Sequence, residues 1–279
     1  MARPVITLLT DFGLDGAAAI CRGVMLGICP DAQIVDVAHT IRKYAIGDGA
    51  FILRIAAPYM PQRTTHVAVV DPGVGTERRP VALRTARGDV LVGPDNGLLI
   101  AAAEALGGIA EARVLENRAL WLPSETSSTF HGRDIFSPVA AHLAAGDAAF
   151  EEVGPALRAE ALVRLAMPAT RARSGVLDTA VAYIDSFGNL RTAATPDDLE
   201  RAIGQLEDGT PLIVEFFAAD GHATHREATQ FGRTFGRVPA GSSLVYVDSD
   251  GDVAFADNQG NAARRLGIAT GAAVRISNA

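Results

Sequence analysis

The sequence predicts an α/β fold: an N-terminal α/β domain with a largely parallel central sheet, followed by a smaller C-terminal β-barrel domain. Through the first half, apolar runs typical of buried strands alternate with helical periodicity. After residue 175 the pattern changes to short alternating strands separated by Gly/Asp turns. We therefore expect domains at 1–155 and 176–279, joined by an extended connector at 156–175.

Each expected element of the first domain follows from its local pattern. Apolar runs rich in β-branched residues predict strands at Val5–Leu9, Ile34–Val37 and His66–Val70. Helical periodicity that ends at Pro or Gly predicts helices at Gly16–Ile28, Gly47–Ala57, Gly97–Leu106 and Phe136–Ala145. Residues Val81–Val92 predict a hairpin that turns at Arg87-Gly88-Asp89.

The second domain is expected to be a small barrel or sandwich. Alternation of apolar and polar residues predicts its strands at Val176–Ile184, Leu212–Phe217, Leu244–Val247 and Val253–Ala256. The sequence contains no internal repeat, so the two domains differ in kind.

Composition excludes several classes of protein. A net charge of -7, a pI near 5.4 and dispersed basic residues argue against nucleic-acid binding and favour a small or cationic substrate. The N-terminal apolar run is too short for a signal peptide, and no segment reaches membrane-spanning length without charge. Cys21 and Cys29 lack metal-ligand spacing and predict buried thiols. We therefore expect a cytoplasmic protein with no membrane or nucleic-acid partner.

Two loops about sixty residues apart carry a carboxylate, a guanidinium and an imidazole. The first runs Val70-Asp71-Pro72-Gly73-Val74-Gly75-Thr76-Glu77-Arg78-Arg79, and the second runs Thr129-Phe130-His131-Gly132-Arg133-Asp134-Ile135-Phe136. Asp71 directly follows an expected buried strand. Because ligands of open α/β sheets gather at the carboxyl ends of the strands, we expect Asp71 to lie at a binding site.

These loops belong to a set of motifs that resembles a known family, the S-adenosylmethionine (SAM) hydroxide adenosyltransferases, which are related to enzymes that attack the same substrate with fluoride or chloride. The other motifs are Thr10-Asp11-Phe12-Gly13, Gly93-Pro94-Asp95-Asn96-Gly97, Ile184-Asp185-Ser186-Phe187-Gly188-Asn189 and Ala256-Asp257-Asn258-Gln259-Gly260. Their order and spacing are specific, and the resemblance runs nearly end to end. It implies a homotrimer with sites between neighbouring subunits, and hydrolysis of SAM to adenosine and L-methionine.

The resemblance implies that Asp71, Arg78 and His131 are the catalytic residues. The sulfonium leaves ribose C5′ as a neutral thioether, so the difficulty lies in the nucleophile, because water has a pKa near 15.7. Arg78 would stabilise hydroxide character, His131 would hold a lone pair or carry the proton, and Asp71 would orient Arg78 or accept the proton. The residues alone leave the base unassigned.

Further residues are implied to bind the substrate. Asp11 ends the first strand, where a carboxylate accepts hydrogen bonds from the two ribose hydroxyls. Asp15 matches a family carboxylate near the methionine end if one gap is allowed, and Tyr44 falls where the halogenating relatives have Trp. Phe130 completes this set in the first domain.

In the second domain, the resemblance implies one group that holds the methionine amino and carboxylate ends and stacks on adenine, and another that contacts adenine and the carboxylate. The residues concerned are Asp185, Phe187 and Asn189 for the first group, and Ser249, Asn258 and Gln259 for the second. Asp250 and Asp257 stand where the halogenating relatives have Arg, so the carboxylate contact departs from the pattern.

Plainer interpretations exist for each of these positions. Taken singly, Asp71 is typical of an Asp-Pro-Gly turn, Arg78 of a solvated loop, Asp11 of a helix N-cap and Tyr44 of core filling. Residues 185–189 are equally typical of a hairpin turn. Only the coincidence of the motifs in family order favours the enzymatic interpretation.

Three rival functions remain. A halogenase is disfavoured because the resemblance puts Tyr where Asp71 stands and Ser where Gly132 stands, and a carboxylate repels a halide. A non-catalytic sensor of adenosine or SAM would not require the Asp71, Arg78 and His131 set. A metal-dependent hydrolase could use Asp11, Asp71 and His131.

We predict neither a metal nor a cofactor. His222 and His225 lie near Asp220 and Glu227, but a polar loop explains this group better than a metal site does.

Overall fold

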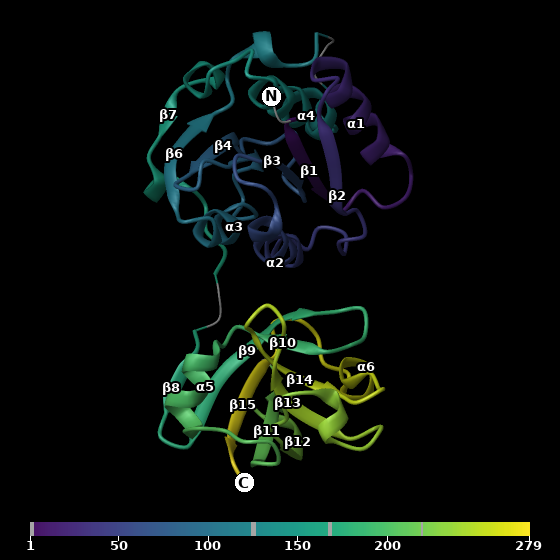
Figure 1. Ribbon diagram of the computed structural model, residues 1–279, viewed down its shortest axis with the longest axis vertical. Helices are drawn as coiled ribbons and strands as arrows, with labels where there is room; N and C mark the ends of the chain where they lie inside the picture. Colours follow the sequence, from purple (N-terminus) through teal and green to yellow (C-terminus); the bar gives the residue numbers. More distant parts are fainter. Residues whose placement is uncertain (1–2, 124–126, 167–168, 219) are drawn as a thin grey trace. The chain divides into compact units, whose positions relative to one another are not determined.

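The computed structural model describes residues 3–123, 127–166, 169–218 and 220–279. The chain divides into two compact units, Met1–Leu165 and Ala166–Ala279 (Figure 1). The first is an α/β unit and the second is built mainly of antiparallel strands. The predicted fold class is confirmed.

A seven-stranded sheet forms the centre of the first unit. Its strands, in spatial order, are β2 (Gln33–Ala38), β1 (Val5–Thr10), β3 (Thr65–Val69), β5 (Val90–Pro94), β4 (Pro80–Thr85), β6 (Ile109–Val114) and β7 (Ala156–Leu157). The β2–β1–β3–β5 part is parallel. The predicted β4–β5 hairpin is present, and β6 and β7 extend it as antiparallel strands.

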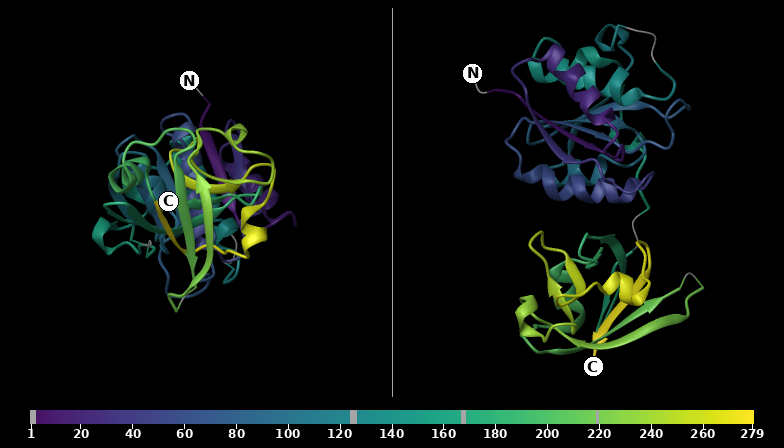
Figure 2. Two further views of the ribbon diagram at one scale, coloured as in Figure 1. Left: turned by 90° about the horizontal axis from the view of Figure 1, so that it is seen from below. Right: turned by 90° about the vertical axis from the view of Figure 1, so that its right-hand side faces the viewer.

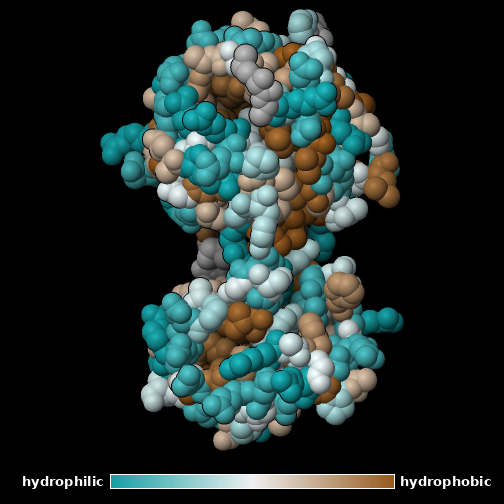
Figure 3. All heavy atoms as spheres, in the orientation of Figure 1, coloured by the Kyte–Doolittle hydropathy of each residue, from teal (hydrophilic) through white to brown (hydrophobic). Residues whose placement is uncertain are grey.

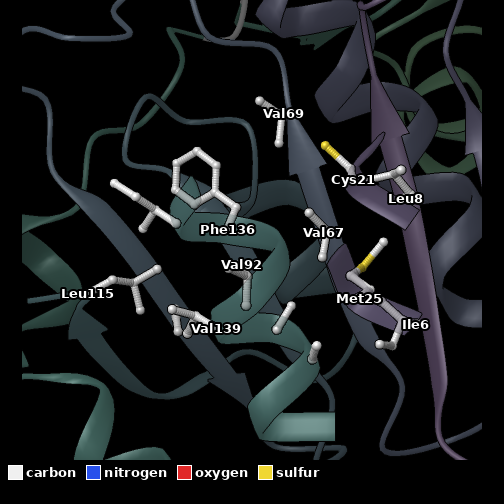
Figure 4. Close-up of a cluster of buried hydrophobic side chains, with 14 of the residues drawn as sticks. Ile6, Leu8, Cys21, Met25, Val67, Val69, Val92, Leu115, Phe136 and Val139 are labelled. Atoms are coloured by element: carbon white, nitrogen blue, oxygen red, sulfur yellow. The ribbon is translucent and has the colours of Figure 1, made fainter. Parts of the chain in front are cut away.

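Helices cover both faces of this sheet, as Figures 1 and 2 show. Helices α1 (Ala17–Ile28) and α4 (Ser137–Ala145) pack together on one face, and α2 (Ile46–Ala56) and α3 (Ile100–Ala105) pack on the other. Figure 4 shows the α1/α4 side, where Cys21, Met25, Phe136 and Val139 meet apolar side chains of β1 and β3. Burial of these apolar side chains holds strands β1 and β3 in place, and the candidate site lies at the carboxyl ends of these strands.

Short single-turn helices connect the larger elements of this unit. They are η1 (Ala57–Tyr59), η2 (Arg118–Leu120), η4 (Phe150–Val153), η5 (Ala159–Ala161) and a π-helical turn, η3 (Gly132–Phe136), which runs into α4. The predicted helix at Phe136–Ala145 therefore begins with a wider turn that carries the second motif. Such π turns are frequent at functional sites.

The second unit is a nearly closed barrel. Its main path is β12 (Ala223–Gln230), β11 (Pro211–Phe217), β15 (Ala273–Asn278), β9 (Val176–Ile184), β10 (Leu190–Thr192), β14 (Val253–Asp257) and β13 (Ser243–Val247), with β8 (Arg171–Arg173) beside β9. A bridge between Phe231 and Val245 brings the two ends of this path together. Phe216 and Phe255 meet edge to face inside, with ring centroids 5.5 Å apart.

Helix α5 (Pro196–Ile203) was not predicted, although the sequence contains a clear signal for it. Thr195 and Asp198 form a reciprocal capping box, and Pro196 occupies the first turn. The sequence analysis also missed helix α6 (Ala262–Leu266), η6 (Phe235–Arg237) and strands β6, β10, β12 and β15. Strand β12 is polar and mostly exposed at a sheet end, so it lacks the apolar alternation that marks a strand.

Among the described residues, no helix combines the length and the hydropathy that crossing a bilayer requires. Apolar atoms nonetheless reach the surface of the first unit (Figure 3). Leu14, Ile20, Leu26 and Val35 are exposed there. Three of these residues lie on α1 or just before it.

Candidate active site

The parallel edge of the first unit brings two of the predicted carboxylates together. Asp11 follows β1 and Asp71 follows β3, and these strands are parallel neighbours in which Thr10 pairs with Val69. Both residues line a cleft of about 570 Å³. Its other lining residues are Phe12, Asp15, Ala17, Lys43, Tyr44, Val69, Val74, Thr129, Phe130, His131 and Gly132.

Asp71, Arg78 and His131 converge as one hydrogen-bonded group. Arg78 Nε donates to Asp71 Oδ1 at 3.0 Å and to Oδ2 at 3.1 Å, and Nη2 donates to Oδ2 at 2.5 Å. The same Nη2 lies 2.9 Å from His131 Nδ1. The Asp71 and Arg78 side chains are only 5% and 10% exposed, so this ion pair is largely screened from water.

The contact with Arg78 fixes the tautomer of His131. A guanidinium nitrogen only donates, so Nδ1 must accept and the ring proton must reside on Nε2. Burial and the positive charge of Arg78 both lower the pKa of His131 from its usual 6.5. The neutral ring is therefore the form that the site stabilises, and its Nε2–H is a donor.

Arg78 lies behind the cleft wall, whereas Asp71 and His131 line the cleft itself. Its guanidinium packs 5.2 Å from the centroid of the Phe136 ring. Nη1 is buried and has no hydrogen-bond partner among the described residues. Arg78 thus holds Asp71 and His131 in position, and its Nη1 is a further donor that neither of them uses.

A second carboxylate is fixed by the loop that carries Tyr44. The Tyr44 N–H donates to Asp11 Oδ2 at 2.9 Å, and Lys43 Nζ donates to the Asp11 carbonyl at 2.7 Å. Tyr44 has a φ of 66°, which is uncommon for a residue with a side chain. Its ring is mostly exposed at the cleft, as is the neighbouring Asp15, so core filling is not its role.

Two aromatic rings close the cleft beside His131. Phe12 and Phe130 meet edge to face, with centroids 5.6 Å apart. Gly132 is required by this packing, because a Cβ on it would lie 2.9 Å from Phe12 Cζ and 3.5 Å from Phe130 Cε2. No side chain fits at position 132 unless Phe12 moves.

In the second unit, Asp185 organises the turn after β9. Its Oδ1 accepts from the backbone N–H groups of Phe187 and Asn189, and its Oδ2 accepts from Asn189 Nδ2 at 2.8 Å. The Phe187 ring is 73% exposed at the tip of this turn. These contacts satisfy the turn interpretation, while the exposed ring offers a surface on which a base can stack.

The remaining predicted residues of this unit lie on two other turns. Ser249 is exposed between β13 and β14, and Gln259 is exposed after β14. Asn258 Nδ2 donates to the Val238 carbonyl at 2.7 Å, so this side chain supports the barrel itself.

The two aspartates that replace arginine in the halogenating relatives are themselves paired with arginines. Asp250 accepts from Arg191 Nη2 at 2.6 Å, and both oxygens of Asp257 accept from Arg265 at 2.8 Å. Arg191 also contacts Asp248 and Asp252. Arginines are therefore present beside both aspartates, but they come from other parts of the chain and are paired with carboxylates.

Within the described ranges, no group of three or more His, Cys, Asp or Glu side chains is arranged to hold a metal ion. Glu227 pairs with Arg265, whereas His222 pairs with Asp220.

Sequence reasoning missed several cleft residues, among them Phe12 and Lys43. Phe12 belongs to the quoted Thr10–Gly13 motif, and its position directly after Asp11 was an available signal. Lys43 precedes Tyr44, and it is the only lysine in the sequence. The presence of a single lysine in the sequence could have identified Lys43 as a candidate site residue.

The fold and the site define a two-unit protein, with a cleft at the carboxyl ends of parallel strands that holds a carboxylate, arginine and histidine group. Family models described as the SAM hydroxide adenosyltransferase N-terminal and C-terminal domains match residues 6–154 and 179–275. The chain belongs to the SAM hydroxide adenosyltransferase family.

Curated relatives cover nearly the whole chain. It is 43% identical to the (R)-S-adenosyl-L-methionine hydrolase of Salinispora tropica, with 98% of each chain covered. It is 37% identical to the protein of that name from Thermus thermophilus, over 98% of this chain and 99% of the relative. The identity to a fluorinase of an Actinoplanes species is 31%, over 99% of this chain and 98% of the fluorinase.

Among solved structures, an uncharacterized conserved protein from Thermotoga maritima superimposes with a TM-score of 0.88. It is 33% identical, and 98% of this chain and all of that chain are covered.

Proposed function

We propose that this protein hydrolyses SAM to adenosine and L-methionine by in-line attack of water on ribose C5′. The observation that carries the proposal is that Asp71 and His131, both bound by Arg78, line the same cleft of about 570 Å³ as Asp11. A ligand-binding protein needs Asp11 to hold a ribose, but it has no use for a buried group that positions water. Hydrolase relatives at 43% and 44% identity over nearly the full length support the same reaction.

The proposal gives Asp71, His131 and Arg78 different tasks. His131 Nε2–H donates to the water oxygen, and Asp71 accepts a proton from the water, because its oxygens retain lone pairs beside those used by Arg78. Arg78 acts through both of them as a positioning residue. The proposal takes Asp71 as the base, because Arg78 occupies His131 Nδ1 and the ring proton lies on Nε2.

The bonds balance without a further reactant. The water oxygen forms a bond to C5′, and the C5′–S bond breaks with its electron pair going to sulfur, which leaves as the thioether of methionine. The proton passes to Asp71 and then to solvent. Because the sulfonium loses its charge in this step, no acid is needed at the leaving group.

The same site disfavours a halide. The Asp71 carboxylate repels an anion, and a Cβ at position 132, which a serine would carry, would lie only 2.9 Å from Phe12 Cζ. Water is therefore the nucleophile that the cleft accommodates.

The proposal includes a homotrimer with sites between subunits, in which the groups of the second unit bind the adenine and methionine ends. The exposed apolar residues Leu14, Ile20 and Leu26 support association through the α1 region. The buried free thiols Cys21 and Cys29 are compatible with the reducing cytoplasm, which we propose as its location. Light scattering that gives three times the 29.1 kDa chain mass tests the trimer.

Activity is tested by incubating the chelator-treated protein with SAM and following adenosine and methionine by liquid chromatography. Both sulfur epimers should be assayed, because the names of the relatives specify the (R) form. Equimolar products from the wild type but not from Asp71→Ala support the proposal. SAM binding without turnover contradicts it and favours a sensor, and dependence on metal favours a metal-dependent hydrolase.

A further inference from the structure

The distribution of cationic residues in the chain singles out one position. The sequence contains 24 arginines and a single lysine, Lys43. That lysine lines the candidate active-site cleft. Since lysine and arginine differ in shape and in donor geometry, a lysine confined to this position points to a role that a compact ammonium fills and a planar fork does not.

The contact made by Lys43 shows what this role is. Its Nζ donates to the main-chain carbonyl of Asp11 at 2.7 Å, and it would lie 3.5 Å from a Cβ on Gly13. The ammonium therefore sits over the Asp11–Gly13 backbone, where the space is narrow. Charge-assisted hydrogen bonds of this kind are the stronger ones in proteins.

The next residue holds the same aspartate from its other end. The Tyr44 N–H donates to Asp11 Oδ2 at 2.9 Å, and it points there because Tyr44 has a φ of 66°. Asp11 is thus held at its carbonyl by Lys43 and at its carboxylate by Tyr44.

The loop that supplies both donors is itself anchored. Arg42 binds Asp48 of α2 through Nε at 2.6 Å and Nη2 at 2.9 Å, and the Asp48 side chain is only 6% exposed. Backbone bonds from Ala45 to Arg42 and from Ile46 to Tyr44 close the turn. A left-handed residue in a braced loop beside a cleft is typical of a position kept for function.

We infer that Lys43 is a positioning residue for ribose recognition: with the Tyr44 N–H it clamps Asp11, so that the free Asp11 oxygen faces the two ribose hydroxyls. The inference rests on the proposed function, because it takes Asp11 to be the ribose ligand. It adds a residue that acts through Asp11 and has no direct part in the chemical step.

The test compares Lys43→Met, which keeps the length of the side chain but removes the ammonium, with Lys43→Arg and with Arg158→Met. Arg158 pairs with Glu160 at an exposed site outside the cleft lining, so Arg158→Met controls for the loss of one positive charge. The ligands are adenosine and 2′-deoxyadenosine, which differ only in one ribose hydroxyl. Dissociation constants are measured by calorimetry, alongside kcat and KM for SAM and the melting temperature.

The expected result for Lys43→Met is a preference for adenosine over 2′-deoxyadenosine that falls roughly tenfold, the value of one charged hydrogen bond. KM for SAM rises by a similar factor while kcat changes less than about threefold. Lys43→Arg recovers part of the lost preference, and Arg158→Met retains all of it.

Chemical modification of the folded wild type provides a second route that does not depend on the folding of a variant. Lys43 carries the only side-chain amine, so reductive dimethylation keeps its charge and one N–H, whereas acetylation removes the charge. Dimethylation is expected to preserve the ribose preference, and acetylation is expected to abolish it. Lys43→Met treated in the same way controls for the N-terminal amine.

Three results overturn the inference. An unchanged ribose preference with a raised KM for SAM shows that Lys43 contacts another part of the substrate. Equal weakening of both nucleosides shows a general distortion of the cleft, and unchanged binding shows no role. Failure of the proposed function is distinguishable, because a protein that binds adenosine through Asp11 but never cleaves SAM still shows the Lys43 effect on nucleoside preference.

Discussion

Replacing Asp71 with Asn tests whether Asp71 is the base, because the substitution keeps the size of the side chain and removes its charge. Arg78 makes three contacts to the two carboxylate oxygens, and the pair is 5% and 10% exposed. In Asn one of these oxygens becomes an NH₂ group, which sets donor against donor. Breaking a buried ion pair costs about 3–5 kcal/mol, and we expect the lower figure because one acceptor remains.

The effect on the rate is expected to exceed the effect on stability. Loss of the general base lowers kcat by 10²–10⁴, and we expect ~10³, which corresponds to about 4 kcal/mol in the activation free energy. Denaturant titration measures the free energy of unfolding, and chromatography of adenosine measures kcat. Adenosine binding should be retained, since Asp11 is untouched.

Asp95→Asn is the matched control. Asp95 accepts from Arg79 Nε at 2.9 Å and from Nη2 at 2.5 Å, and its side chain is 2% exposed, but it does not line the cleft. We expect a comparable loss of stability with kcat nearly unchanged. The reasoning is refuted if Asp71→Asn turns over within tenfold of the wild type, or if Asp95→Asn is equally inactive.

Three further predictions concern pH and packing. Burial and the charge of Arg78 lower the pKa of His131 below 6.5, so the ring stays neutral down to a more acidic pH. As the pH is lowered, kcat/KM should therefore fall with a midpoint below pH 6.5. A midpoint above pH 6.5 would contradict the tautomer assignment. Gly132→Ser places a Cβ 2.9 Å from Phe12 Cζ and should lower the free energy of unfolding, measured by calorimetry, by about 1–3 kcal/mol. Adding Phe12→Leu should restore this stability. If the effects of the two substitutions are simply additive, residues 12 and 132 do not contact each other. Burial alone would raise the pKa of Asp89, but hydrogen bonds from His66 and from Arg87, whose Nε lies 2.6 Å away, lower this pKa to about 2. Asp89 therefore contributes about 2 kcal/mol of stability above pH 4, which is lost as the pH falls toward 2. In denaturant titrations of Asp89→Asn, the free energy of unfolding should fall less steeply between pH 4 and pH 2 than in the wild type. An unchanged pH dependence would mean that other carboxylates cause the loss of stability in acid.

Local pattern was sufficient for the elements that bury a face. Helix α1 was expected at Gly16–Ile28 and lies at Ala17–Ile28, because its apolar residues recur at helical spacing and it ends before Pro30. Strand β12 was missed because its side chains are mostly polar and are exposed or half-buried on both faces, so they show no apolar alternation. The connector at 156–175 stays a prediction; it contains β7, η5 and β8.

The site was predicted only in part, for a physical reason. Asp11 and Asp71 follow strands, so their positions at one sheet edge follow from parallel pairing. The clamp by Lys43 and Tyr44 depends on a left-handed φ and on a contact between residues 32 positions apart, neither of which leaves a local pattern. Likewise, the tautomer of His131 depends on which atom of Arg78 reaches it.

The central claim is that water attacks C5′ of SAM, and the most direct test is to run the reaction in water enriched in oxygen-18. We predict adenosine that carries one oxygen-18 at its 5′-hydroxyl and methionine without the label, both detected by mass spectrometry. Adenosine without the label would show that the oxygen comes from elsewhere, and SAM that stays bound without being cleaved would contradict the account.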